Sequence, residues 1–340
     1  MFSTSRRQLN VLPVFAVKTV QLYGQSTQHD PWRERGAMNI PLWAALAILT
    51  SLLWAIVNIL DKVILYRYNI NPWIYLGLDG LVGVISLIII LVGWSGEIFA
   101  NPQRAIVLAL LSGLAVATFN VLYFYALRVS AVTIIIIFVQ ITPIFSLFWG
   151  LTLLGERYGL LSYAGMFLIL SGAVVAGLSG KNPTFNDGRQ RKTVGALLLM
   201  LLATFSLSLA YLLSDVALKS VSVVSVFFWQ RLSLFLISIP IFIVQRQKIR
   251  KISKSPVLFT SLVEIINILA FLSIIAAYAQ GPLVVITFLS SLQPMWVLIL
   301  TWIIDTTKLR LFSETEEFSR VRLILACAFV ILGIYFIRAT

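Results

Sequence analysis

Long apolar runs separated by short polar stretches are the dominant pattern along this chain. A helix that crosses the ~30 Å hydrocarbon core of a bilayer needs about 20 apolar residues, because each residue adds about 1.5 Å. Ten runs fit this pattern and are predicted to be membrane-spanning helices: Pro41–Leu65, Trp73–Val92, Ala105–Leu127, Ala131–Leu154, Gly159–Leu178, Val194–Leu218, Val221–Val244, Pro256–Ala279, Leu283–Ile304 and Val321–Ile337. Their apolar residues are continuous rather than alternating, which favours helices over strands.

The composition supports a protein that lies in a lipid bilayer. Hydrophobic residues make up 59% of the chain and charged residues only 11%, whereas soluble proteins average about 45–50% and about 25%. Such a chain has too few charges to cover a surface facing water, which excludes a soluble globular enzyme and a disordered tail. The net charge of +13 is assigned to basic loops facing anionic lipid headgroups rather than to nucleic-acid binding. The predicted fold class is an all-α, multi-pass protein of the cell (plasma or inner) membrane.

The chain divides into two halves of five predicted helices each. Residues 181–193 form the longest polar stretch between helices and are predicted to link repeats at residues 39–180 and 194–340. Pro143 and Pro294 occupy equivalent places in the fourth helix of each half. An odd number of helices per repeat inserts the second half upside down, with a pseudo-two-fold axis in the membrane plane. Inverted repeats are typical of alternating-access transporters, which bind substrate near the midplane.

Three short motifs carry a family resemblance. They are PIFSLFWGLTLLGER (Pro143–Arg157), the stretch from Trp54 to Lys62, and SSLQP (Ser290–Pro294). On these motifs the chain resembles the EamA type of the drug/metabolite transporter superfamily over residues 39–338. The resemblance implies two five-helix repeats, a transport function and both termini in the cytoplasm.

The second half departs from the pattern of the first. The Leu-Gly-Glu that ends at Glu156 is missing there, and Thr307 stands at the equivalent place. Glu317, in the polar extension that follows, is a candidate substitute. Glu156 itself sits at a helix end, and it is expected to order a loop with Arg157 rather than to bind substrate.

Three ionisable residues lie well inside predicted spans: Asp79, Arg231 and Glu264. Each costs about 2.5–3.5 kcal/mol at the bilayer centre, so each is a candidate for function. In one interpretation Arg231 attracts an anionic group of the substrate while Asp79 or Glu264 carries a coupling proton. In the other, Arg231 forms a static salt bridge with Asp79 or Glu264, because a lone buried charge is worse than a paired one.

Neutral polar residues inside the spans mark a candidate substrate path. The candidates are Asn58, Asn120, Gln140, Asn267 and Gln293. Pro143 and Pro294 each free a backbone carbonyl one turn earlier, and in hydrocarbon such a break must face protein or a water-filled cavity. The alternative is that the amides bond between helices and the prolines only kink them. Asn58 shares a helix face with Trp54 and Asp61.

The function predicted from these features is secondary transport. The sequence carries no phosphate-binding loop and no catalytic constellation, and one cysteine (Cys327) with one histidine (His29) cannot form a Cys/His zinc site. No enzyme activity, metal or cofactor is predicted. We expect alternating-access transport of small polar or amphipathic metabolites, for example amino acids. The alternatives are a multidrug exporter, a non-transporting scaffold or a membrane-embedded enzyme.

Two expectations concern the ends of the chain. Residues 1–38 contain no run long enough to span a membrane, and Met38 directly precedes the first apolar run, so this extension is predicted to be dispensable or a mis-assigned start.

The orientation of the chain in the membrane has two conflicting indications. The resemblance places both termini in the cytoplasm, whereas the loops after odd-numbered helices hold most Lys and Arg, which favours termini outside the cytoplasm. Gln245–Lys254 is the densest basic cluster. The sequence sets no oligomeric state, and a monomer is plausible.

Overall fold

The computed structural model describes residues 40–68, 70–129, 138–177, 187–250, 252, 254–306 and 320–338. Every regular element within these ranges is a helix, which confirms the all-α prediction. The predicted extension over residues 1–38 lies outside the described residues, and so do Thr307 and Glu317.

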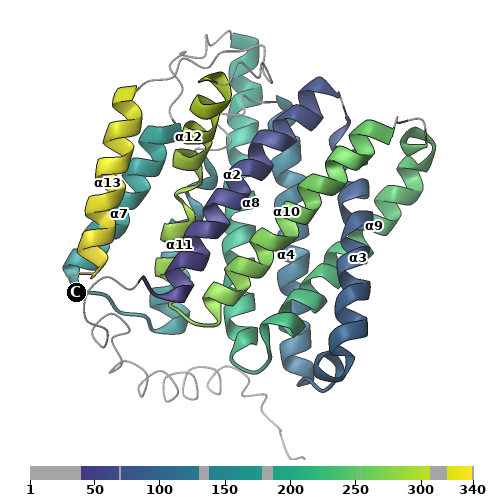
Figure 1. Ribbon diagram of the computed structural model, residues 1–340, viewed down its shortest axis with the longest axis horizontal. Coiled ribbons are helices and arrows are strands. Elements are labelled where there is room, and N and C mark those ends of the chain that lie inside the picture. The colour runs from purple at the N-terminus through teal and green to yellow at the C-terminus, as the bar shows by residue number, and fades with distance from the viewer. Residues whose placement is uncertain are drawn as a thin grey trace, which may run out of the picture.

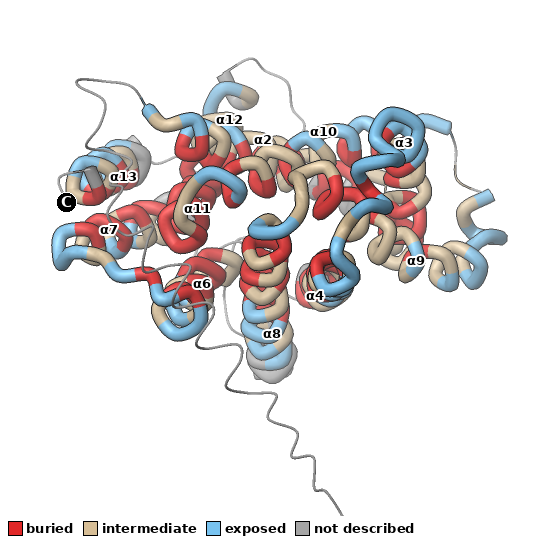
Figure 2. The backbone as a smooth tube through the Cα atoms, turned by 90° about the horizontal axis from the view of Figure 1, so that it is seen from below, coloured by how far each residue is buried: buried red, intermediate tan, exposed pale blue. Residues whose placement is uncertain are grey.

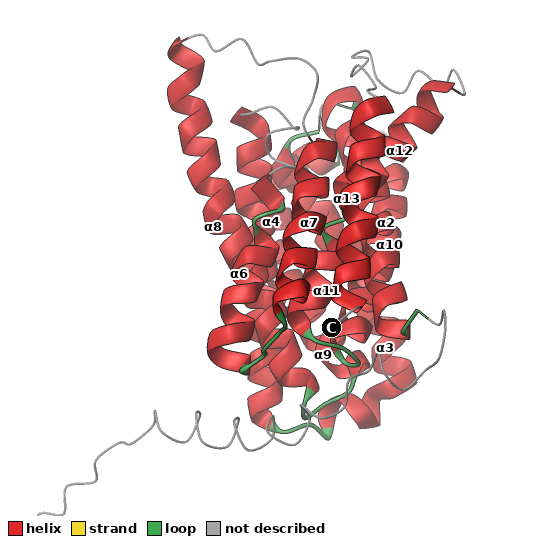
Figure 3. Ribbon diagram, turned by 90° about the vertical axis from the view of Figure 1, so that its left-hand side faces the viewer, coloured by secondary structure: helices red, strands yellow, loops and turns green. Residues whose placement is uncertain are grey.

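The helices follow one another with short connections (Figure 1). The first half contains α2 (Leu42–Arg67), α3 (Pro72–Phe99), α4 (Gln103–Val129), α6 (Thr142–Trp149), the π-helical turn η1 (Gly150–Leu154) and α7 (Leu160–Gly177). The second half contains α8 (Asp187–Leu218), α9 (Val223–Ile249), α10 (Lys254–Tyr278), α11 (Leu283–Ser290), α12 (Gln293–Thr306) and α13 (Arg320–Arg338). Because α8 begins at Asp187, the latter part of the predicted linker is helical. Figure 3 shows α8 extending past its neighbours at that end.

The lengths of the helices agree with a multi-pass membrane protein. Seven apolar segments within the described ranges are long enough to cross a membrane, and α11 and α12 together make one of them. Three more apolar helices are shorter: Thr142–Leu154, Leu160–Val175 and Ile324–Ile337. These three lie within the fourth, fifth and tenth spans predicted from the sequence.

Helix pairing follows the two repeats. Two of the extensive contacts are α2 with α10 and α4 with α8. In each, the first helix of one half packs against the third helix of the other half. The pairs α3 with α9 and α7 with α13 join equivalent helices of the two halves. In Figure 1, α2 runs from the lower side to the upper side, and α8 runs from the upper side to the lower. The halves are therefore inverted relative to each other.

The pair of α7 and α13 depends on two glycines. A Cβ atom on Gly165 would lie 2.5 Å from the Gly333 carbonyl oxygen, and one on Gly333 would lie 2.6 Å from that of Gly165. Small residues let two helix backbones approach closely, a common way for helices to associate in membranes.

Helices begin beside the two prolines at which breaks were predicted. Helix α6 begins at Thr142 and α12 at Gln293, so Pro143 and Pro294 are each the second residue of a helix. Proline is tolerated in a first turn because its missing N–H has no intrahelical acceptor there. The Thr142 hydroxyl donates to the Val139 carbonyl at 2.7 Å, so a carbonyl freed near Pro143 has a partner.

The outer surface is apolar while the centre is closely packed. Figure 2 shows buried residues on the facing sides of α2, α8, α10 and α11. Large apolar side chains are exposed on outer helices, among them Ile85, Ile88, Ile89 and Val92 of α3 and Val321, Ile324 and Ile331 of α13. Exposed apolar surface of this extent is what a helix facing lipid presents.

Candidate functional site

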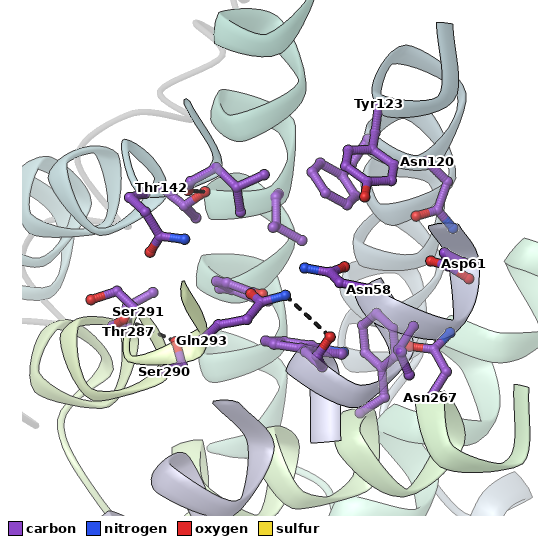
Figure 4. A pocket seen from close by; sticks show the side chains of 18 of the residues that line it. Asn58, Asp61, Asn120, Tyr123, Thr142, Asn267, Thr287, Ser290, Ser291 and Gln293 are labelled. Carbon is purple, nitrogen blue, oxygen red and sulfur yellow. Dashed lines mark hydrogen bonds between the residues drawn. The ribbon is translucent and has the colours of Figure 1, made fainter. Parts of the chain in front are cut away.

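A central cavity lies between the two halves of the chain. Its walls come from α2, α3 and α4, from the start of α6, from α8 and α10, and from the break between α11 and α12. The cavity volume is about 110 Å³, and a water molecule needs about 10–15 Å³ on the same measure. Figure 4 shows amide and hydroxyl groups arranged around this space.

Most of the residues predicted for the substrate path line this cavity. They are Asn58, Asp79, Asn120, Gln140, Asn267, Gln293 and Pro143. Their helices are far apart in sequence, so the packing of the two halves brings them together. Pro294 is not in the lining, although it directly follows Gln293 in α12.

One face of α2 lines the cavity as the helical spacing predicts. Trp54, Asn58 and Asp61 all contribute to its wall. The Tyr75 hydroxyl donates to Asp61 Oδ1 at 2.5 Å, which fixes this carboxyl against α3. The amide of Gln293 donates to the Trp54 carbonyl at 3.3 Å, so α12 is tied to the same stretch of α2 (Figure 4).

Aromatic side chains form a large part of the wall. Trp54 stacks on Tyr211 with ring centroids 6.4 Å apart and meets the edge of Phe271 at 5.6 Å. Tyr75, Phe119, Tyr123 and Phe124 also line the cavity. The sequence does not identify Phe271, Tyr75, Phe119, Tyr123 and Phe124 as site components, because an aromatic residue in an apolar helix faces lipid, core or cavity equally well.

Hydroxyl groups concentrate at the two helix breaks. Thr287, Ser290 and Ser291 line the cavity at the end of α11, and Thr142 lines it at the start of α6. The Ser290 and Ser291 hydroxyls donate to carbonyls of the last turn of α11 at 2.8 and 2.6 Å. Their oxygen lone pairs remain available to a solute. Since α6 contacts α11, the equivalent breaks of both halves meet at one cavity.

The structure corrects the placement expected for Arg231 and Glu264. Arg231 Nη1 lies 2.5 Å from Glu264 Oε1, and Asn267 donates to the other oxygen of Glu264 at 3.0 Å. Neither Arg231 nor Glu264 lines the central cavity. Phe271 does line it, and the Arg231 guanidinium lies over the ring of Phe271 at 5.0 Å. The static salt bridge is therefore the arrangement present in this structure.

A second, smaller cavity adjoins the first between α3, α4 and α9. Its volume is about 20 Å³, enough for a single water. Asp79 and Asn120 line both cavities, whereas Arg231 lines only this one. Arg231 Nε and Nη2 are buried without a hydrogen-bond partner, so they are placed to bond to such a water. Asp79 interacts electrostatically with both Glu264 and Arg231.

Glu156 joins the two halves on the lower side of the molecule. This buried carboxylate accepts the N–H groups of Leu283 at 3.1 Å and Val284 at 3.4 Å, and the Tyr158 hydroxyl at 2.6 Å. It thus caps the first turn of α11, where the helix dipole favours negative charge. Burial raises the pKa of Glu156 above its ordinary value. Glu156 was expected to order a loop with Arg157, and the hydrogen bonds found here join it to Tyr158 and to the start of α11.

Comparison with known proteins identifies the family. The chain matches the sequence profile of the EamA-like transporter family over residues 41–178 and again over residues 194–339. The chain belongs to this family. It is therefore a multi-pass membrane transporter of the drug/metabolite type, with two EamA repeats, and members of the family are transporters rather than enzymes.

Other comparisons bear on the fold alone. The chain is similar, among other solved structures, to one described as the crystal structure of a protein, with a TM-score of 0.66 and 17% sequence identity. The match covers 86% of this chain and 95% of that chain. No curated protein matches the sequence. Within the described part of the EamA chain, no three His, Cys, Asp or Glu residues are grouped so that they could hold a metal ion.

Proposed function

We propose that this protein is a secondary active transporter that moves small polar or amphipathic metabolites by alternating access. The proposal includes ten membrane-spanning helices, arranged as inverted five-helix repeats at residues 39–180 and 194–340. The observation that carries it is the central cavity, which both halves build and at which the equivalent helix breaks of both halves meet. Substrate sites of inverted-repeat transporters lie at this kind of place.

The packing around the cavity supports a conformation that is closed on the lower side. The cavity is lined by the second half of α2, from Trp54 to Asp61, and by the beginning of α3. In Figure 1 these segments lie toward the upper side. Below the cavity, Leu283, Val284 and Ile286 of α11 are fully buried. Opening of the lower side would have to separate Glu156 from α11.

Asp79 is the residue we assign to coupling. It lines the central cavity and the small side cavity, and it interacts with the Arg231–Glu264 pair. A carboxyl in this place can exchange a proton with water in either cavity. Glu264 is less suited, because Arg231 and Asn267 already occupy its two oxygens.

The orientation we propose follows the distribution of basic residues. Arg246, Lys248 and Arg250 lie at the end of α9, on the upper side of Figure 1. Basic loops stay in the cytoplasm, so we assign the upper side to the cytoplasm and both termini to the outside of a plasma or inner membrane. A monomer contains the whole cavity. A reporter fused after Thr340 that is active only in the cytoplasm would overturn this orientation.

Transport itself is tested with the full chain in liposomes. Proteoliposomes are incubated with a metabolite mixture containing amino acids and amines, and the trapped solutes are identified by mass spectrometry. The doubly substituted variant Asn58→Leu/Gln293→Leu should lose the uptake, because leucine fills the cavity with apolar atoms. Leu262→Ala, at an exposed position of α10, is the control that should keep it. The proposal fails if no solute enters faster than into liposomes without protein.

A further inference from the structure

The charged groups around the central cavity are unevenly distributed. Asp61 and Asp79 line it, and no Lys, Arg or His is present among the lining residues that the structure describes. The nearby guanidinium of Arg231 is bound to Glu264 at 2.5 Å. Asp61, Asp79 and Glu264 interact with one another electrostatically. This cluster therefore contains three carboxyl groups and one guanidinium.

This excess of carboxyl groups around the cavity disfavours binding of an anionic solute, whether the carboxyl groups are ionised or protonated. Ionised carboxylates repel an anion, and protonated ones supply no positive charge to hold it. A buried anion without a cationic partner is strongly unfavourable. The same carboxylates, when ionised, are natural partners for a cationic group, because they lack enough cations of their own.

The helix breaks do not replace the missing positive charge. The start of a helix can attract anions through its free N–H groups. At the second break, however, α11 ends at Ser290 and α12 begins at Gln293, so a negative helix end lies beside the positive one. Pro294 also removes one N–H donor from the first turn of α12, as Pro143 does in α6.

The aromatic wall fits the rest of a cationic solute. Trp54, Tyr211 and Phe271 form one contiguous aromatic group on the cavity wall. The face of an aromatic ring attracts cations, tryptophan most strongly, and it also stacks on flat apolar groups. The cavity thus offers carboxyls for a charged end and aromatic surface for an apolar body.

We propose that the central cavity binds compact organic cations, amines with an apolar or aromatic body and no acidic group, in preference to amino acids and organic acids. This rests on the proposed function and narrows its substrate class. Arg231 then serves to hold Glu264 and α10 in place, and it does not bind substrate.

Binding of three related probes to the purified full-length protein tests this proposal. Tyramine is a cation, tyrosine adds a carboxylate to it, and 4-hydroxyphenylacetate is an anion with the same ring. We expect tyramine to bind at least tenfold more tightly than the other two, measured by thermal shift and by tryptophan fluorescence. Equal or tighter binding of tyrosine or the acid, or no binding of tyramine, would overturn the proposal.

Matched variants locate the preference. Asp79→Asn and Asp61→Asn should each reduce the affinity for tyramine at least tenfold. If Asp79→Asn does not fold, Asp61→Asn alone tests the contribution of the carboxyl groups. Asp215→Asn removes a buried carboxyl that pairs with Lys219 at 3.7 Å outside the cavity lining, and it should bind tyramine as the wild type does. Loss of binding in Asp215→Asn alone would contradict the assignment. Tyramine binding by a protein that takes up no solute of the metabolite mixture into liposomes would leave this proposal standing and refute the transport function.

Discussion

The Glu156 carboxylate, on the loop between η1 and α7, accepts the backbone N–H of Leu283, the first residue of α11, at 3.1 Å. Glu156 belongs to the first half of the chain and Leu283 to the second. A carboxylate at a helix N-terminus satisfies donors that have no partner within the helix. The contact therefore holds the two halves together at the start of α11.

Replacing Glu156 with Ala should weaken this link between the two halves. The change leaves the buried N–H groups of Leu283 and Val284 without their acceptor, a loss of about 1–3 kcal/mol of stability. The melting temperature of the detergent-solubilised protein should fall, and protease cleavage near residues 279–282 should become faster. Arg157→Ala, at the neighbouring exposed position, is the control. Equal melting temperatures of Glu156→Ala and the wild type would contradict the role of this contact.

The Glu156 carboxyl should also contribute to the pH dependence of stability. Burial raises the pKa of Glu156 in the folded protein above its ordinary value of 4.5, so the folded state binds its proton more tightly than the unfolded state does. The stabilisation from this group is complete below pH 4.5 and is lost as the pH rises through the folded pKa. As the pH rises, the melting temperature of the wild type should therefore fall relative to that of Glu156→Gln. A constant difference from pH 4 to pH 8 would contradict the raised pKa.

The Arg231–Glu264 pair should behave as a structural unit. Arg231→Met leaves Glu264 as an uncompensated buried charge, and the expected loss is about 3–5 kcal/mol. The double variant Arg231→Met/Glu264→Met should recover most of that stability, since it removes both charges. Its uptake of the solutes found for the wild type should also be kept. A double variant that is stable but inactive would show that the pair acts on substrate directly.

The close approach of α7 and α13 should tolerate no side chain at its centre. Gly165→Ala places a methyl group 2.5 Å from the Gly333 carbonyl oxygen, and such overpacking costs about 1–3 kcal/mol. The melting temperature should fall accordingly. Gly195→Ala in α8 has open space around the new methyl group and should be neutral or slightly stabilising, because alanine favours helix. A similar loss in both variants would show that helix contact is not the cause.

The sequence by itself determined the helices and their interruptions. A bilayer requires long apolar segments with internally satisfied backbones, so the apolar runs alone identify helices such as Leu42–Arg67. Proline lacks an N–H, so Pro143 and Pro294 mark candidate breaks, whereas Pro240 lies inside the continuous helix α9. Polar residues are rare enough in these spans that Asn58, Asn120 and Gln293 are recognisable as candidates without any coordinates.

Only the tertiary structure decided which groups face one another. Arg231 was a candidate partner of Asp79 or Glu264, and helix packing brought it to Glu264 at 2.5 Å and kept it outside the cavity. The sequence places Trp54 on the helix face of Asn58, but the wall that Trp54 shares with Tyr211 depends on where the packing places α2 and α8. The acceptor role of Glu156 depends on a backbone N–H that every residue except proline possesses. Local patterns record length, polarity and backbone preference, whereas pairing across the two halves arises from long-range packing that no local pattern contains.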